Sequence, residues 1–137
     1  MVQSFVNNMT NDWFRSKIIT GKKIGSTLGY PTLNLDNPAI LKNYQKGVYA
    51  CRVKIGNKTF GGALFFGPKL ALGEKEDTLE IFVFDFHHQI YGQTVSFKLL
   101  DFIRPPLDFS DKEGLKKQIM EDCGKIQRIL QSFPKQP

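Results

Sequence analysis

Hydrophobic and polar residues alternate along most of the chain with a period of two, which is typical of β-strands. The alternation predicts six strands, at 13–20, 31–35, 47–55, 58–66, 79–86 and 94–103. In the third of them one face collects Tyr49, Cys51, Val53 and Ile55. The turn at Gly56-Asn57 is of the hairpin type, so neighbouring strands are expected to run antiparallel.

The period changes after Pro105 and Pro106, which end the predicted sheet. Ser110 is a candidate N-cap, and Glu113 three residues later completes a capping box. Apolar residues then recur at helical spacing: Leu115, Ile119, Cys123, Ile126 and Leu130. Six short strands and one helix to cover an opening favour a small closed β-barrel, because closure removes exposed edge strands.

The length of 137 residues fits one domain. Residues 1–12 are polar and rich in asparagine, which predicts a flexible N-terminal arm before a single domain at 13–137. We find neither an apolar run of the ~20 residues that a spanning helix needs nor a secretion signal, so we expect a cytoplasmic protein. Cys51 and Cys123 lie far apart without a metal-binding motif, and we expect two reduced thiols.

The formal net charge of +6 allows a polyanionic partner. The basic residues are, however, scattered along the sequence, and the densest groups are the pairs Lys22-Lys23 and Lys116-Lys117. A nucleotide or phosphate ligand would explain this charge as well as RNA would. A solvated basic surface without any ligand explains it too.

Three glycines recur every fourth residue in a loop between the first two predicted strands: Gly21, Gly25 and Gly29. The spacing is neither that of a Walker A loop nor that of a dinucleotide-binding fingerprint. Glycines let backbone N–H groups approach phosphate oxygens closely, and Lys22 and Lys23 add positive charge. The simpler interpretation is a loop that only joins two strands.

Thr32 and Asn34 follow this loop, at the start of the short second strand. They are two residues apart, so their side chains point to the same face. A hydroxyl and an amide oxygen are hard ligands that suit Mg²⁺ on a nucleotide, since phosphates and water supply the other ligands. Alternatively, both side chains only satisfy nearby backbone groups.

Glu80 opens a row on one face of the fifth predicted strand that continues with Phe82, Phe84 and Phe86. A carboxylate at the edge of an apolar cavity is partly desolvated, which makes it a better base than a free glutamate. The alternative is a solvated strand end. The rings are either core residues or one wall of a pocket for a flat aromatic ligand.

In combination, these segments resemble the riboflavin kinase family, whose members make FMN from riboflavin and ATP. The resemblance runs from about Ile18 to Leu130. "GKKIGSTLGYPTLNL" resembles the family's glycine loop and Pro-Thr-Ala-Asn signature, and "KGVYACRV" its Gly-Val-Tyr strand. "LEIFVFDFHHQIYG" resembles the segment with the catalytic glutamate, "LLDFIRPPLDF" the Phe-Leu-Arg-Pro-Glu segment, and "LKKQIMED" the family's helix.

The resemblance implies a six-stranded antiparallel Greek-key β-barrel with a C-terminal α-helix. It implies an ATP:riboflavin 5′-phosphotransferase that depends on Mg²⁺ or another divalent ion, with Glu80 as general base. Thr32 and Asn34 would contact the metal and the ATP phosphates. The glycine loop would lie over the nucleotide, with Gly21, Lys22, Lys23, Gly25 and Gly29 as phosphate-binding residues. Arg104 and Asp122 would contact the flavin.

The implied partners are riboflavin and ATP, with no nucleic acid, no membrane and a monomeric state. Three positions depart from the family: Ser26 stands where Arg or Lys is usual, Leu33 replaces Ala, and Pro106 replaces Glu. Loss of a cation beside the phosphates would weaken ATP binding.

Two other functions stay open. One is a catalytically silent relative that binds riboflavin or FMN. The other is a basic barrel that binds single-stranded nucleic acid, which predicts aromatic residues interleaved with basic ones on a strand face. The phenylalanines of the fifth strand have no Lys or Arg among them, so this alternative ranks last.

Overall fold

The computed structural model describes residues 12–19, 32–70, 73–88, 90–107 and 112–133. The elements, in chain order, are β1 (Phe14–Ile19), β2 (Thr32–Leu35), the 3₁₀ helix η1 (Pro38–Leu41), β3 (Gly47–Ile55), β4 (Lys58–Pro68), β5 (Asp77–Val83), β6 (Thr94–Arg104) and α3 (Lys112–Gln131). The six strands and the final helix confirm the predicted order of elements.

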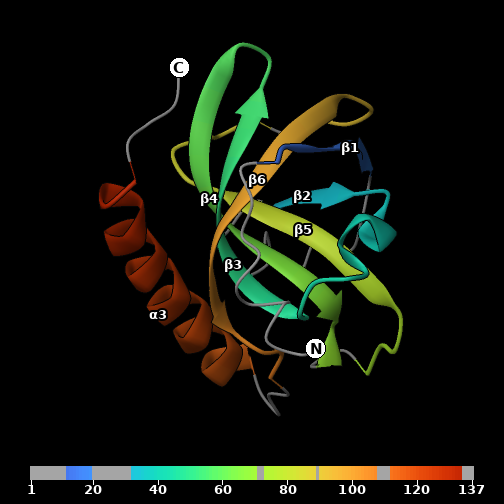
Figure 1. The fold of residues 1–137 in the computed structure, drawn as a ribbon. Helices are drawn as coiled ribbons and strands as arrows, with labels where there is room; N and C mark the ends of the chain where they lie inside the picture. The colour runs from blue at the N-terminus through green and yellow to red at the C-terminus, as the bar shows by residue number, and fades with distance from the viewer. Residues whose placement is uncertain (1–11, 20–31, 71–72, 89, 108–111, 134–137) are drawn as a thin grey trace.

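The strands form one closed barrel in the order β1-β2-β5-β4-β3-β6, and every neighbouring pair is antiparallel (Figure 1). β3, β4 and β5 follow one another in space, and β6 returns to lie beside β3. This is the Greek-key arrangement, which the sequence-based hypothesis expected. Three pairings join strands that are not consecutive in the chain: β1 with β6, β2 with β5 and β3 with β6. The pairing of β2 with β5 builds the candidate site.

The barrel interior is filled by the faces that the alternation predicted. Tyr49, Cys51 and Val53 of β3 and Phe97 of β6 are each 0% exposed. Leu33 and Leu35 of β2 and the alternate residues of β5 point into the same core, listed as Leu79, Ile81 and Val83. The outer face of β5 therefore carries Glu80 and Phe82, which are half-buried.

Helix α3 lies along the outside of the barrel wall, against β3, β4 and β6 (Figure 1). The expectation that it covers an opening of the barrel was therefore wrong. Its Ile126 packs with Val48 and Ala50, two of the residues of β3 that face outward, and forms a second core. Arg52 of β3 fixes the C-terminal end of the helix, because its Nη2 donates hydrogen bonds to the carbonyl oxygens of Leu130 (3.5 Å) and Phe133 (2.9 Å).

Strand β5 ends at Val83, earlier than the alternation predicted. Asp85 has a φ of 61°, so the chain turns there and the row of phenylalanines is broken. Phe84 packs in the cluster under the helix, whereas Phe86 packs against the barrel core. The row of three rings is thus neither one wall of a pocket nor one layer of the core. The predicted N-cap Ser110 lies outside the described residues.

Both cysteines are free thiols, in agreement with the prediction. Burial raises the pKa of Cys51, which is fully enclosed in the barrel core. Burial also raises the pKa of Cys123 to about 11, and the charge of Asp122 adds to that shift. Within the described part of the chain, no helix combines the length and apolar character needed to cross a membrane.

Two glycines with open space around them give a matched test of backbone conformation. A Cβ added at Gly124, inside α3, meets only Nη1 of Arg128 at 3.9 Å, and a Cβ at Gly56 meets nothing within 4 Å. Gly124→Ala is expected to raise the free energy of unfolding by about 1 kcal/mol through helix propensity. Gly56 has a φ of 63°, so Gly56→Ala should lower it by roughly 1–2 kcal/mol. Urea denaturation measures both, and equal signs would contradict this prediction.

Candidate active site

The pairing of β2 with β5 brings together the three residues that the sequence singled out. Asn34 lies directly opposite Glu80, and Thr32 lies opposite Phe82. Side chains opposite each other in an antiparallel pair share a face and have Cβ atoms about 4.5–5.5 Å apart. Leu33 between them is buried in the barrel, so Thr32 and Asn34 point outward on the side of Glu80. The register thus assembles a hydroxyl, an amide and a carboxylate on one outer face.

Glu80 is held in a nearly closed environment. Its Oε2 lies 2.9 Å from Nζ of Lys69, and the side chains of Lys69 and Glu80 are only 10% and 16% exposed. Oε2 is buried and makes no hydrogen bond with favourable geometry, so the contact with Lys69 is one of charge. On the side away from Asn34, the neighbour of Glu80 in the sheet is Phe65 of β4. The carboxylate therefore has an apolar wall, a cation and an amide around it.

Sequence reasoning missed Lys69. It directly follows β4, in a segment rich in glycine, proline and charge that we interpreted only as a loop. The pairing of Gly67 with Thr78 and of Pro68 with Asp77 keeps this end of β4 against β5, which places Lys69 within reach of Glu80. A lysine next to a glutamate in space leaves no periodic signal in the sequence, and only the register reveals it.

The Lys69–Glu80 pair can be tested through stability. Lys69→Met leaves a nearly buried carboxylate without its counter-charge, and we expect the free energy of unfolding to fall by about 2 kcal/mol. In a Glu80→Gln background the same substitution should cost much less, because no charge is left uncompensated. Urea denaturation of the four proteins of this double-mutant cycle gives the coupling energy. Additive effects would show that the pair contributes nothing.

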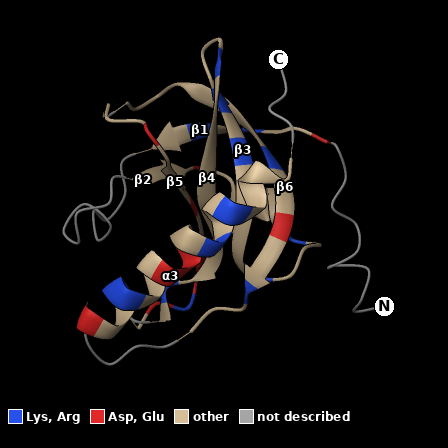
Figure 2. Ribbon diagram, turned by 90° about the vertical axis from the view of Figure 1, so that its left-hand side faces the viewer, with Lys and Arg blue, Asp and Glu red and all other residues tan. Residues whose placement is uncertain are grey.

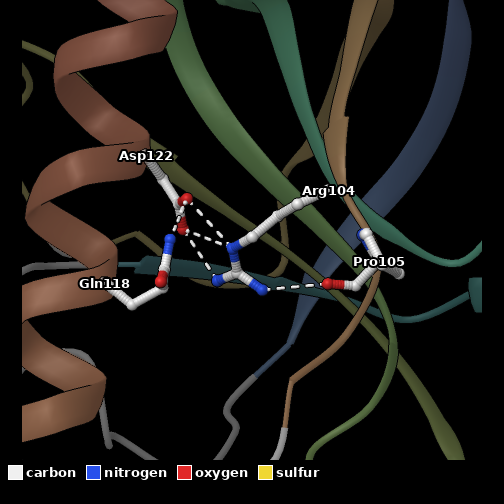
Figure 3. Close-up of polar contacts among 4 residues, drawn as sticks. All are labelled: Arg104, Pro105, Gln118 and Asp122. Carbon is white, nitrogen blue, oxygen red and sulfur yellow. Dashed lines mark hydrogen bonds and ion pairs between the residues drawn. The ribbon is translucent and has the colours of Figure 1, made fainter.

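The two candidate flavin residues form an ion pair between β6 and α3 (Figure 3). Nε of Arg104 donates to both carboxylate oxygens of Asp122, at 2.9 and 3.1 Å, and Nη2 donates to Oδ2 at 2.7 Å. Asp122 also accepts a hydrogen bond from Nε2 of Gln118 at 3.0 Å, and Nη1 of Arg104 donates to the carbonyl oxygen of Pro105 at 3.0 Å. Asp122 is 3% exposed, so this network is part of the packed structure.

Glu80, with its neighbours Asn34 and Lys69, lies at the same end of the barrel as the Arg104–Asp122 ion pair. Gly67, two residues before Lys69, is surrounded by side chains from both: a Cβ built there would lie 3.5 Å from Cγ of Pro106 and 3.6 Å from Cζ of Phe65. Phe65 is the neighbour of Glu80, and Pro106 follows Arg104 by two residues. The site therefore offers the Glu80 carboxylate as an acid–base group. The Arg104–Asp122 pair nearby can bind a second part of the same ligand through polar contacts.

The predicted phosphate-binding loop falls at residues 20–31, outside the described part. The expectations for Gly21, Lys22, Lys23, Gly25 and Gly29, and for Ser26, thus remain predictions. His87 and His88 are exposed in the segment after β5. Across the described ranges, no three His, Cys, Asp or Glu side chains gather in a way that could hold a metal ion by themselves.

The family comparison agrees with this geometry. The model of the Flavokinase family, described as riboflavin kinase, matches residues 10–130. The chain belongs to the riboflavin kinase family. The match covers all six strands of the barrel and nearly all of α3, so both halves of the candidate site lie within the riboflavin kinase domain.

Several curated members of the riboflavin kinase family are similar to this chain. The RNA-binding riboflavin kinase RibR of Bacillus subtilis is 38% identical over 106 residues, which cover 77% of this chain and 45% of that protein. The trifunctional protein RibF/MnmA of Mycoplasmoides gallisepticum is 34% identical, over 83% of this chain and 17% of its own length. The bifunctional riboflavin kinase/FMN adenylyltransferase of Listeria monocytogenes is 31% identical, over 79% and 35%. The chain thus spans less than half the length of these relatives.

Two solved structures share the fold. A protein described as a macrolide-efflux protein from Streptococcus pneumoniae superposes with a TM-score of 0.70 at 29% identity, over 84% of this chain and 38% of that one. Riboflavin kinase from Trypanosoma brucei superposes with a TM-score of 0.62 at 22% identity, over 87% of this chain and 79% of that one. Because its identity is only 22%, the second structure supports the barrel fold alone.

Proposed function

We propose that this chain transfers the γ-phosphoryl group of ATP to the ribityl 5′-hydroxyl of riboflavin, which yields FMN and ADP. The observation that carries the proposal is the β2–β5 register, which places Asn34 directly opposite Glu80 and Thr32 on the same face, inside a riboflavin kinase domain. Two of the three curated relatives described above, those from Bacillus subtilis and Listeria monocytogenes, carry riboflavin kinase in their names, in agreement with this assignment.

Glu80 takes the role of general base. As the 5′-oxygen attacks the γ-phosphorus, the hydroxyl proton passes to the Glu80 carboxylate, and the bond from phosphorus to the bridging oxygen of ADP breaks. Phe65 and Lys69 flank Glu80, whose side chain is only 16% exposed, so that access of bulk water is limited, and the ammonium of Lys69 compensates the charge of the carboxylate. Phosphoryl transfer requires mainly positioning and charge neutralisation. The pairing of β2 with β5 supplies the positioning, because it fixes Thr32, Asn34 and Glu80 relative to one another.

The residues present fit a divalent ion bound together with ATP. The hydroxyl of Thr32 and the amide oxygen of Asn34 are hard neutral donors on one face, and Oε2 of Glu80 is a buried oxygen without a hydrogen bond. Few protein oxygens suffice for Mg²⁺ on a nucleotide, since phosphates and waters complete its shell. When bound, the ion would neutralise negative charge on the transferred group. Thr32 and Asn34 would hold it.

Arg104 and Asp122 take unequal parts in flavin binding. An arginine has five N–H donors. Arg104 uses one on each of its three nitrogens for Asp122 and Pro105, which leaves one N–H on each Nη for a ligand. Both oxygens of Asp122 already accept hydrogen bonds from Arg104, and one also accepts from Gln118. We therefore assign the direct flavin contact to Arg104, and Asp122 acts through it as a positioning residue.

The test is a direct assay of the product. Riboflavin, ATP and Mg²⁺ are incubated with the protein, and the flavins are separated by chromatography and detected by fluorescence. The proposal expects FMN to appear only when both ATP and the ion are present. Riboflavin binding without FMN would instead support a catalytically silent relative, and absence of both would overturn the assignment.

A further inference from the structure

The fold gathers basic residues that are scattered in the sequence onto one outer face of the barrel. The β1–β6–β3 register puts Arg15, Ser96 and Lys54 in one row across three strands, and Lys98 pairs with Arg52 in the next row. We call the following set the basic face: Trp13, Arg15, Lys17, Arg52, Lys54 and Lys98. Figure 2 shows blue segments on the neighbouring strands β3 and β6; of the basic residues of these strands, Arg104 at the end of β6 is not part of the basic face.

Within the described part of the chain, the charges of the basic face are compensated only weakly, by the charge of Asp36 beside Lys17. There, no carboxylate forms an ion pair with any of its five cations, since the ion pairs found involve Lys46, Lys69 and Arg104. Asp36 lies beside Lys17, but its carboxylate accepts hydrogen bonds from the backbone N–H of Lys17 (3.0 Å) and the hydroxyl of Ser16 (2.9 Å). An anion bound here would meet unpaired positive charge.

Trp13 stands in the middle of these cations. The Nζ atoms of Lys54 and Lys98 lie 4.2 and 5.2 Å from the centroid of its ring. The two ammonium groups that converge on one ring repel each other, and a phosphate near them would relieve that repulsion. The indole, which is half-buried, offers a stacking surface beside such a phosphate.

A polar cavity adjoins the basic face. It has a volume of about 640 Å³ and lies between the β3–β4 hairpin, the turn after β5 and the last turns of α3. Arg52 lines it, and the β3–β4 register pairs Lys54 with Thr59 at its rim. Its lining includes the rings of Phe60 and Phe84, the amides of Gln127 and Gln131 and the carboxylate of Asp85. Rings to stack on and amides that both donate and accept suit a nucleobase.

We propose that the basic face and this cavity bind single-stranded RNA, with phosphates over the exposed Arg15 and Lys17 and the half-buried Lys54, and with a base in the cavity. Arg52 and Lys98 are each 7% exposed and add positive charge behind this surface. Asp85 is an acceptor for a ribose 2′-hydroxyl, which DNA lacks. A lipid surface fits less well, because membrane-binding faces need apolar anchors. Of the exposed large hydrophobic residues in the described part, only Ile19 belongs to β1, β3 or β6. The nucleic-acid alternative ranked last because the phenylalanines of the fifth predicted strand have no Lys or Arg among them. On the basic face the fold instead places an aromatic residue, Trp13, next to Lys54 and Lys98.

The experiment uses the full chain and a fluorescein-labelled 20-nucleotide oligouridine, with anisotropy as readout. Trp13 is the single tryptophan of the chain, so quenching of intrinsic fluorescence reports on stacking at this residue alone. With three to five phosphates neutralised, the slope of log K against log salt should be about −2 to −3.5. Arg15→Gln/Lys54→Gln should reduce the magnitude of that slope by about 1.4, and Trp13→Leu should weaken binding about tenfold.

The matched control is Lys116→Gln/Lys117→Gln, which removes the same charge from exposed positions on α3. The proposal expects this control to bind RNA like the parent protein, and both double variants to form FMN at the parent rate, which also shows that they fold. Equal losses in the two double variants would overturn the proposal in favour of undirected charge attraction. Three further results would overturn the proposal. Oligodeoxyuridine could bind as tightly as oligouridine, or vesicles of phosphatidylserine and phosphatidylcholine could bind in place of RNA. The third is that no RNA binds at 50 mM salt.

Discussion

Glu80→Gln is expected to lower kcat for FMN formation by about 10²–10⁴-fold and to leave the affinity for riboflavin nearly unchanged. The amide keeps the shape of the side chain opposite Asn34 but cannot take the proton from the attacking hydroxyl. Positioning by the rest of the site is retained, so a residual rate above the uncatalysed reaction should remain. Chromatographic measurement of FMN gives kcat, and quenching of riboflavin fluorescence gives the affinity.

The control for this variant is Glu76→Gln, which makes the same chemical change at an exposed residue just before β5. It should leave both constants unchanged. If Glu80→Gln kept more than a tenth of the turnover, Glu80 would not be the base, although the family assignment would stand. If the parent protein binds riboflavin but makes no FMN, the two variants would be indistinguishable, as expected for a silent relative.

The sequence was most informative where alternation and turn residues agreed. β3 begins and ends where it was predicted, because nine residues of alternating character are bounded by Gly47 and by the Gly56-Asn57 turn. β5 was extended too far, because Phe84 and Phe86 continue the alternation across a turn. The alternation of side chains gives no information on the backbone dihedral angles of Asp85, and its positive φ ends the strand.

The candidate site was only partly predictable, for a related reason. Thr32, Asn34 and Glu80 could be chosen by residue type and resemblance, but their proximity depends on the pairing of two strands that are distant in the sequence. Lys69 was missed because its partner is set by the same pairing. The basic face shows this limit on a larger scale: Arg15, Lys54 and Lys98 stand on three strands and become neighbours only when the barrel closes.

Asp122→Ala is expected to have the largest effect on stability, a loss of about 3–5 kcal/mol in the free energy of unfolding. The substitution leaves the guanidinium of Arg104, whose side chain is 16% exposed, without its charge partner, and it frees Gln118. Asp101→Ala is the control, since Asp101 is an exposed residue of β6 and should change stability by no more than about 0.5 kcal/mol. Urea denaturation followed by circular dichroism measures both.

A double replacement shows how much of the loss in stability comes from the missing Arg104–Asp122 attraction and how much from leaving Arg104 without a counter-charge. In Arg104→Met/Asp122→Leu neither charge is left buried, and we expect this protein to be more stable than Asp122→Ala despite carrying one more substitution. If Arg104 also contacts riboflavin, the double variant should fold well yet bind the flavin at least tenfold more weakly. A double variant that folds and binds riboflavin like the parent would restrict the pair to a structural role between β6 and α3.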